Sequence, residues 1–210
     1  MQIVTISASF GAGGSVVGPA VAERLGIPFI DRAIPIAVAR SLAVPLDEAL
    51  DRDERRPSFF ERIIASMAAA GTSMIGPTAV MGTITNEDDF RAATERVLRE
   101  LATGGGVVLG RAGAVVLAKH RFALHVRLDG PRERRIERVM SHEQTDVDSA
   151  TRVLDETDRA WESYVRFFYK TDPRDPRLYH LIIDSTALPL DACTELIVSA
   201  ARYVAGTGLG

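Results

Sequence analysis

The 210-residue sequence has little of several features that would place a protein in a narrow class. It contains one cysteine, Cys193, so no disulfide can form within the chain. A net charge of −3 argues against non-specific binding of nucleic acid. No charged segment followed by an apolar one opens the sequence, as it would in a secretory leader. We therefore expect a cytoplasmic protein that binds no nucleic acid.

Long apolar runs are also missing. The uncharged stretch over residues 63–86 could cross a bilayer by its length, but three glycines, a proline and several hydroxyl residues interrupt it. We therefore expect no membrane partner. Small residues and methionines in such a stretch are typical either of plain core packing or of a contact between subunits. A homo-oligomer formed through residues 59–85 is thus one of two open interpretations.

The most informative stretch lies in the first thirty residues, where a strand, a glycine loop and a helix follow one another. Residues 2–6 form a β-branched run, residues 10–15 are nearly bare backbone, and apolar residues then recur at helical spacing until Gly26. Parallel α/β domains build phosphate sites in this way, because loop N–H groups and the helix N-terminus both attract anions. The alternative is a tight turn in a fold that binds no phosphate.

The loop matches the phosphate-loop pattern G-x-x-x-x-G-K-[ST] only in part. With Gly13 on the second glycine, Ser15 supplies the magnesium-binding hydroxyl, Ala8 replaces the first glycine and Gly14 replaces the lysine. Pro19 leaves two possible starts for the helix, because proline fits a first turn and costs about 3 kcal/mol in a helix interior. We favour a start at Gly14 over one at Gly18.

Five apolar segments, around Ile3, Phe29, Val107, Leu124 and Ile182, alternate with helical patterns. Their continuous rather than alternating hydrophobicity predicts an α/β fold, a doubly wound parallel sheet with helices on both faces. At 210 residues and 46% hydrophobic content, we expect one domain.

Several charged residues follow the ends of these strands. Gly110 and Arg111 follow the strand at 107–109, at the edge where open α/β sheets bind ligands. The alternative for Arg111 is a surface ion pair. Arg135 and Arg138 are three residues apart and share a helix face. On the long helix predicted over 149–169, Asp158 and Arg166 lie on roughly similar sides, away from the apolar stripe.

Taken together, these parts resemble the cytidylate kinase-like family of phosphate-loop proteins. The similarity rests on residues 6–14, Gly110-Arg111, the run 135–139, the helix from Asp158 to Phe168 and the strand over 179–184. It implies a three-layer, P-loop kinase-like domain over residues 1–210, with five parallel strands in the order 2-3-1-4-5. It also implies an acceptor-binding helical subdomain at 45–85 and a lid at 140–175.

The resemblance further implies roles for individual residues in ATP-dependent phosphoryl transfer to CMP or a related small phosphorylated acceptor. The loop residues Gly11, Ala12, Gly13, Gly14 and Ser15 would hold the phosphates of ATP, and Ser15 would contact Mg²⁺. The acceptor would contact Asp31, Arg111 and Asp158. The catalytic arginines would be Arg135, Arg138 and Arg166.

The sequence departs from the family pattern at positions that usually carry charge: Ala8, Ser9, Ser15 and Trp161. Phosphoryl transfer depends on positioning and charge neutralisation, so these changes predict weak activity. The alternative hypothesis is a catalytically silent module with a degenerate phosphate loop that binds a nucleotide or a protein partner.

Overall fold

The computed structural model describes residues 2–31, 103–110 and 112–207. The strands are β1 (Ile3–Ala8), β2 (Phe29–Asp31), β3 (Gly106–Leu109), β4 (Ala123–Asp129) and β5 (Leu181–Asp184). The helices are α1 (Gly14–Leu25), α6 (Gly113–Val116), α7 (Arg132–Glu143), α8 (Val147–Tyr169), the short 3₁₀ helix η2 (Pro176–Leu178) and α9 (Leu190–Thr207).

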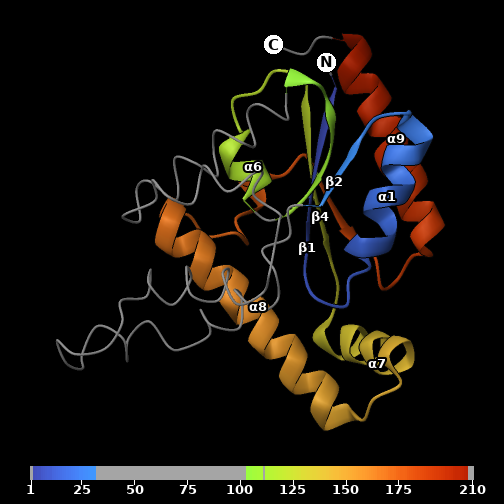
Figure 1. The fold of residues 1–210 in the computed structure, drawn as a ribbon, viewed down its shortest axis with the longest axis vertical. Helices are drawn as coiled ribbons and strands as arrows, with labels where there is room; N and C mark the ends of the chain where they lie inside the picture. The colour runs from blue at the N-terminus through green and yellow to red at the C-terminus, as the bar shows by residue number, and fades with distance from the viewer. Residues whose placement is uncertain (1, 32–102, 111, 208–210) are drawn as a thin grey trace, which may run out of the picture.

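The five strands form one sheet in the order β2-β3-β1-β4-β5, and every neighbouring pair is parallel (Figure 1). Ile6 of β1 pairs with Leu109 on one side and with Val126 on the other, so β1 is the central strand. The predicted parallel α/β fold is confirmed, and the strand order is the one that the resemblance implies.

Helices cover both faces of the sheet (Figure 1). Helices α1 and α9 pack against each other on one face, where Val17, Val21 and Ile197 join strand residues such as Val4 in the main core. Helix α6 lies against β1 on the opposite face. This covering on two sides explains why the strands read as continuous apolar runs.

A smaller core joins α7 to α8 and reaches the glycine loop. It consists of Ile136, Val139, Ala150 and Leu154, with Phe10 of the loop packed against them. Helix α8 begins at Val147, two residues before the predicted start, because Asp146 caps it by accepting a hydrogen bond from the Ser149 amide. The two helices therefore stand beside the loop as one packed unit.

Helix α1 begins at Gly14, as we favoured, and Pro19 lies inside it. Helix α7 begins at Arg132, because the preceding Pro131 is extended with φ −50° and ψ 137°. Residues 45–85, including the proposed subunit contact at 59–85, lie outside the described residues. The lid assignment at 140–175 covers the end of α7, α8 and the turn before η2, and it stays a prediction.

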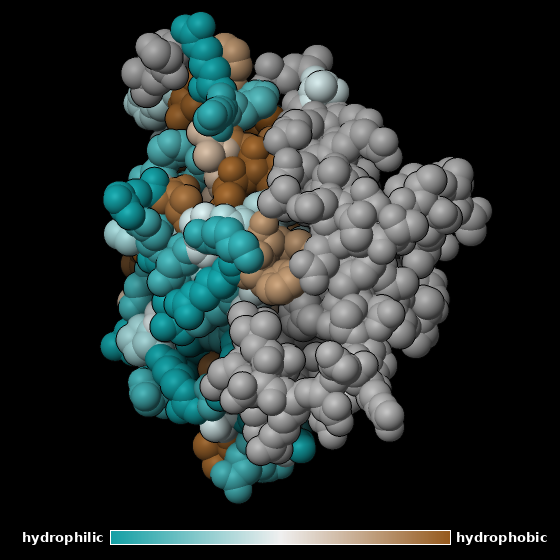
Figure 2. Space-filling model, turned by 90° about the vertical axis from the view of Figure 1, so that its left-hand side faces the viewer, coloured by the Kyte–Doolittle hydropathy of each residue, from teal (hydrophilic) through white to brown (hydrophobic). Residues whose placement is uncertain are grey.

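Within the described ranges, no helix has the length and hydrophobicity needed to cross a bilayer. Figure 2 shows one face on which hydrophilic residues cover much of the described surface, with hydrophobic residues gathered mainly in its upper part.

A buried histidine lies in the sheet away from the glycine loop. The ring of His125 on β4 is within hydrogen-bond distance of Thr5, with Nδ1 2.8 Å from Oγ1. It also stacks on His180, with the ring centroids 5.0 Å apart. Burial first, and the charge of His180 second, lower the pKa of His125 from 6.5 to about 4. The folded protein therefore keeps this imidazole neutral.

This arrangement predicts a loss of stability in mild acid. Between pH 6.5 and about 4 the unfolded chain binds a proton at His125 that the folded chain does not, so the free energy of unfolding falls as the pH falls. The full effect is about 3 kcal/mol. Urea unfolding across this range should show a shallower pH slope in His125→Gln than in wild type. His142→Gln, at an exposed site on α7, is the control, and equal slopes in all three proteins would contradict the prediction.

Candidate active site

The glycine loop joins the carboxyl end of the central strand β1 to helix α1. Gly11 and Gly13 have φ angles of 77° and 78°, in the left-handed region that favours glycine. A Cβ atom on Gly11 would lie 2.7 Å from the backbone oxygen of Arg135, and one on Gly13 would lie 2.7 Å from Leu190. The loop is therefore shaped both by its own backbone and by close packing against α7 and α9.

The carbonyl oxygens of residues 10–12 each accept a hydrogen bond from a side chain of another element. Phe10 O accepts from Arg135 Nη1 at 2.9 Å, Gly11 O from Arg138 Nη1 at 3.4 Å, and Ala12 O from Ser185 Oγ at 2.7 Å. Arg135 and Arg138 come from α7, and Ser185 follows β5. The acceptors of the loop are thus satisfied from outside it.

The amides at the start of α1 differ from these carbonyls in their hydrogen bonding. Gly13 is the N-cap and offers no side chain to cap the helix. In the part of the chain that the structure describes, the N–H groups of Gly14 and Ser15 have no hydrogen-bond acceptor, as expected for a first helical turn. The Ser15 side chain is exposed at this point. Unpaired amides and the helix dipole together make this end of the loop attractive to an anion.

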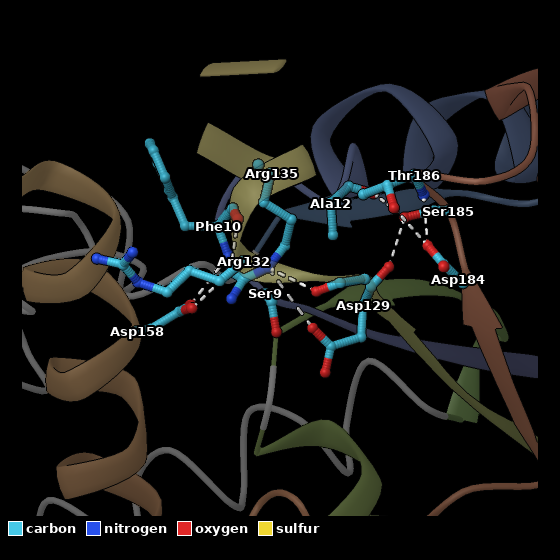
Figure 3. A network of polar contacts seen from close by, with 12 residues as sticks. Ser9, Phe10, Ala12, Asp129, Arg132, Arg135, Asp158, Asp184, Ser185 and Thr186 are labelled. Carbon is cyan, nitrogen blue, oxygen red and sulfur yellow. Dashed lines mark hydrogen bonds and ion pairs between the residues drawn. The ribbon is translucent and has the colours of Figure 1, made fainter. Parts of the chain in front are cut away.

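Arg135 and Asp158 both form hydrogen bonds with the backbone of Phe10 in the glycine loop. Asp158 Oδ1 accepts from the Phe10 amide at 3.0 Å, and its Oδ2 accepts from Arg135 Nη1 at 2.6 Å. The two side chains are only 10% and 14% exposed. Figure 3 shows Arg135 between Asp158 of α8 on one side and Asp129 of β4 on the other. The geometry thus brings two predicted site residues together at the loop.

A second ion pair, which is partly buried and which the sequence analysis missed, lies at the end of β4. Arg127 donates to Asp129 Oδ2 through Nε at 3.1 Å and Nη2 at 2.6 Å. Burial alone would raise the pKa of Asp129, but the hydrogen bonds and charge of Arg127 hold it below its usual range. The Nη1 of Arg127 also donates to the carbonyl of Pro173 at 3.0 Å. The spacing of two residues, which places both side chains on one face of a strand, was the available signal.

Ser185 links the loop after β5 to the glycine loop. It is fully buried, and its amide donates to the carbonyl of Asp129 at 3.0 Å. Its own carbonyl accepts from Arg138 Nη2 at 2.7 Å. Nothing in the local sequence pointed to this serine, because its partners are far away along the chain. Arg138 therefore bridges two loops rather than facing solvent alone.

Among the described site residues, Arg166 does not lie at the glycine loop. Arg166 donates to Asp172 at 3.3 Å, and both side chains are about half exposed. Eight helical residues separate Arg166 from Asp158, so it lies about 12 Å farther along α8. Asp31 is the last residue of β2, but its side chain lies outside the described part of the structure, as does Arg111.

The sheet order, the glycine loop and the α7–α8 unit agree with a comparison of the sequence with known families. The profile of the cytidylate kinase-like family matches residues 3–187. The chain belongs to this family. The match covers the glycine loop and every strand of this cytidylate kinase-like protein.

Three curated relatives match parts of the chain. A cytidylate kinase of Methanopyrus kandleri is 31% identical over 121 residues, which are 53% of this chain and 63% of that protein. A shikimate kinase of Ruegeria pomeroyi is 26% identical over 61% of this chain and 52% of its own length. A uronate isomerase of Corynebacterium glutamicum is 26% identical over 70% of this chain but only 28% of its own length. The chain thus spans between 28% and 63% of these relatives.

Solved structures support the fold. An uncharacterised protein from Eubacterium ventriosum superposes with a TM-score of 0.62 at 18% identity, covering 96% of this chain and 99% of that one. A gluconokinase from Sinorhizobium meliloti gives a TM-score of 0.52 at 19% identity, with coverages of 98% and 94%. At these identities the similarity shows the fold alone.

The position of the missing lysine is closely packed. A Cβ atom on Gly14 would lie 2.5 Å from the Cβ of Ala8 and 3.2 Å from a methyl group of Leu109. Any side chain at residue 14 therefore requires Ala8 or the loop to move. The close packing of this loop therefore requires a residue without a side chain at position 14.

We predict that Gly14→Ala destabilises the fold, because overpacking at this close contact costs about 2–3 kcal/mol. This cost exceeds the gain of up to about 1 kcal/mol that alanine brings to a helix. Thermal or urea unfolding should show the loss, and the double variant Ala8→Gly/Gly14→Ala should recover much of it. Ser15→Ala, at the exposed neighbouring site, is the control. Unchanged stability of Gly14→Ala would show that the loop adapts freely.

Proposed function

We propose that this chain is a weak phosphotransferase of the nucleoside monophosphate kinase type. It would use ATP and Mg²⁺ and act on CMP or a related small acceptor. The observation that carries the proposal is the glycine loop at the carboxyl edge of β1. Side chains hold its carbonyls, while the amides of Gly14 and Ser15 find no acceptor among the described residues. The cytidylate kinase among its relatives supports CMP as the first acceptor to test.

In this proposal the loop Gly11–Ser15 holds the phosphates of ATP through its amides. Arg138, at the loop, would contact the transferring phosphate, and Arg111 the acceptor monophosphate. Asp31 would orient the acceptor, whereas Arg166 would have to approach from its present position beside Asp172. Residues 45–85 would hold the acceptor and residues 140–175 would close over it. We place this activity in the cytoplasm, with any contact between copies formed by residues 59–85.

The site fits a magnesium ion that arrives with ATP better than a resident metal. The described residues contain no group of three histidine, cysteine or carboxylate side chains that could hold a metal. Mg²⁺ usually keeps several waters and takes its remaining ligands from phosphates and one or two protein groups. The exposed Ser15 hydroxyl could supply one such ligand. The ion would neutralise charge on the phosphates.

The charge balance around the loop supports weak transfer. Arg127 and Arg135 are neutralised by Asp129 and Asp158. Ion pairs also form in Arg132–Asp155, Arg134–Asp184 and Arg166–Asp172. A magnesium–ATP complex and a monophosphate each bring about two negative charges into a site of low dielectric constant. Most arginines near the loop are thus already compensated within the chain.

The same balance favours a second candidate function. A catalytically silent module could bind a nucleotide at the loop amides, or a protein partner, without transferring phosphate. The paired arginines and the uncharged residues Ala8, Ser9 and Trp161 support this alternative.

The proposal predicts detectable binding of ATP with slow or absent turnover. Steady-state assays with ATP, Mg²⁺ and CMP should give rates below the range of roughly 1–100 s⁻¹ that is usual for kinases. Calorimetric titration of Arg111→Ala should show a larger loss of affinity for CMP than for ATP. Arg121→Ala, at an exposed site before β4, is the control.

Two outcomes would contradict the proposal in different ways. Turnover within the usual kinase range would refute weak catalysis but keep the reaction. If no nucleotide or phosphate bound at all, the kinase proposal would fail and the interaction module would remain.

A further inference from the structure

The carboxylate of Asp158 occupies a position where two donors of the glycine loop region converge. One is the Phe10 amide, 3.0 Å from Oδ1, and the other is Arg135 Nη1, 2.6 Å from Oδ2 (Figure 3). The Asp158 side chain is 14% exposed, so the negative charge is held mostly away from solvent. A loop amide and a guanidinium are the donors that proteins use to bind phosphate oxygens.

Both donors are held by contacts other than those with Asp158. Arg135 also donates from Nε to the carbonyl of Gly130 at 3.1 Å and from Nη1 to that of Phe10 at 2.9 Å. Phe10 packs against the small core between α7 and α8. The two donors would therefore keep their places if a different anion replaced the carboxylate.

We propose that Asp158 occupies an anion site of the glycine loop from within the chain, and that a phosphate-bearing ligand competes with it for Arg135 and the Phe10 amide. This inference rests on the proposed function, because it takes the loop as the phosphate site. It places Asp158 on the donor side of the reaction, whereas the resemblance places it with the acceptor.

A purely structural ion pair between α7 and α8 is the competing explanation. The same two helices already carry such a pair in Arg132 and Asp155, which lies at the surface. Asp158, in contrast, also accepts from the backbone of the glycine loop. A structural pair predicts weaker or unchanged anion binding when its charge is removed, whereas a competing carboxylate predicts tighter binding.

Asp158→Asn separates these explanations. Its amide oxygen can still accept from the Phe10 N–H or from Arg135, but it no longer neutralises the guanidinium or repels an incoming anion. We expect calorimetric titration to show at least fivefold tighter binding of inorganic tripolyphosphate, and of ATP, than in wild type. Affinity for CMP should stay within twofold. Asp155→Asn removes the same charge from the same helix and should leave all three affinities within twofold.

Two further measurements keep the test independent of a folding defect. Arg135→Met introduced into Asp158→Asn should abolish the gain in tripolyphosphate affinity, while thermal unfolding confirms that each variant is folded. In the wild-type protein, saturating tripolyphosphate should shift the NMR resonance of the Phe10 amide, because its acceptor changes. An unshifted Phe10 resonance in a protein that binds tripolyphosphate would overturn the inference even if Asp158→Asn did not fold.

The outcomes distinguish this inference from the proposed function. If wild type binds ATP and transfers phosphate but Asp158→Asn binds tripolyphosphate no more tightly, the function stands and the inference fails. If Asp158→Asn loses affinity for CMP alone, Asp158 belongs to the acceptor site and the inference is wrong. If Asp158→Asn gains tripolyphosphate binding although no variant transfers phosphate, the inference holds without the kinase reaction. Absence of tripolyphosphate binding in both proteins overturns it.

Discussion

The shape of the site depends on the three hydrogen bonds that hold the carbonyls of residues 10–12. A trans peptide unit is planar, and its C=O and N–H point in opposite directions. No cis bond occurs among the described residues. Fixing Ala12 O on Ser185 therefore turns the Gly13 N–H away from Ser185, and fixing Phe10 O on Arg135 turns the Gly11 N–H away from α7. The side chains that hold the loop carbonyls thus also set the direction of the loop amides.

The same side chains explain why the site is structured but weakly charged. Buried ion pairs contribute little net attraction, because removing both charges from water offsets much of their Coulomb energy. Their value here is orientation: Arg135 and Asp158 fix Phe10, and Arg127 with Asp129 fixes the end of β4. An arginine whose charge is neutralised by an aspartate attracts an anionic ligand less strongly. The same ion pairs therefore determine both the shape of the loop and the weak positive charge of the site.

Local patterns in the sequence predicted the parallel sheet and the glycine loop, because apolar runs and glycine clusters are recognised within a few residues. For the first helix the local pattern left two starts open, and the structure has the favoured one, at Gly14. The partnership of Arg135 with Asp158 was not, since it depends on how α7 and α8 pack. The pair Arg127–Asp129 was missed because its partial burial depends on distant segments, such as the carbonyl of Pro173 that accepts from Arg127. Ser185 meets Ala12 across 173 positions, a distance that no local pattern spans.

The loop is encoded near the start of the chain, yet its packing partners come late. Gly11 meets Arg135, Gly13 meets Leu190, and the central strand pairs Ile3 with Gly106 and Ala123. A chain made from its N-terminus exposes β1 long before either neighbouring strand exists, and contacts so distant in sequence form slowly. The glycine loop consequently reaches its final shape only when β5 and α9 have joined the sheet. The glycine loop is thus synthesised before its packing partners but becomes a binding site only after them.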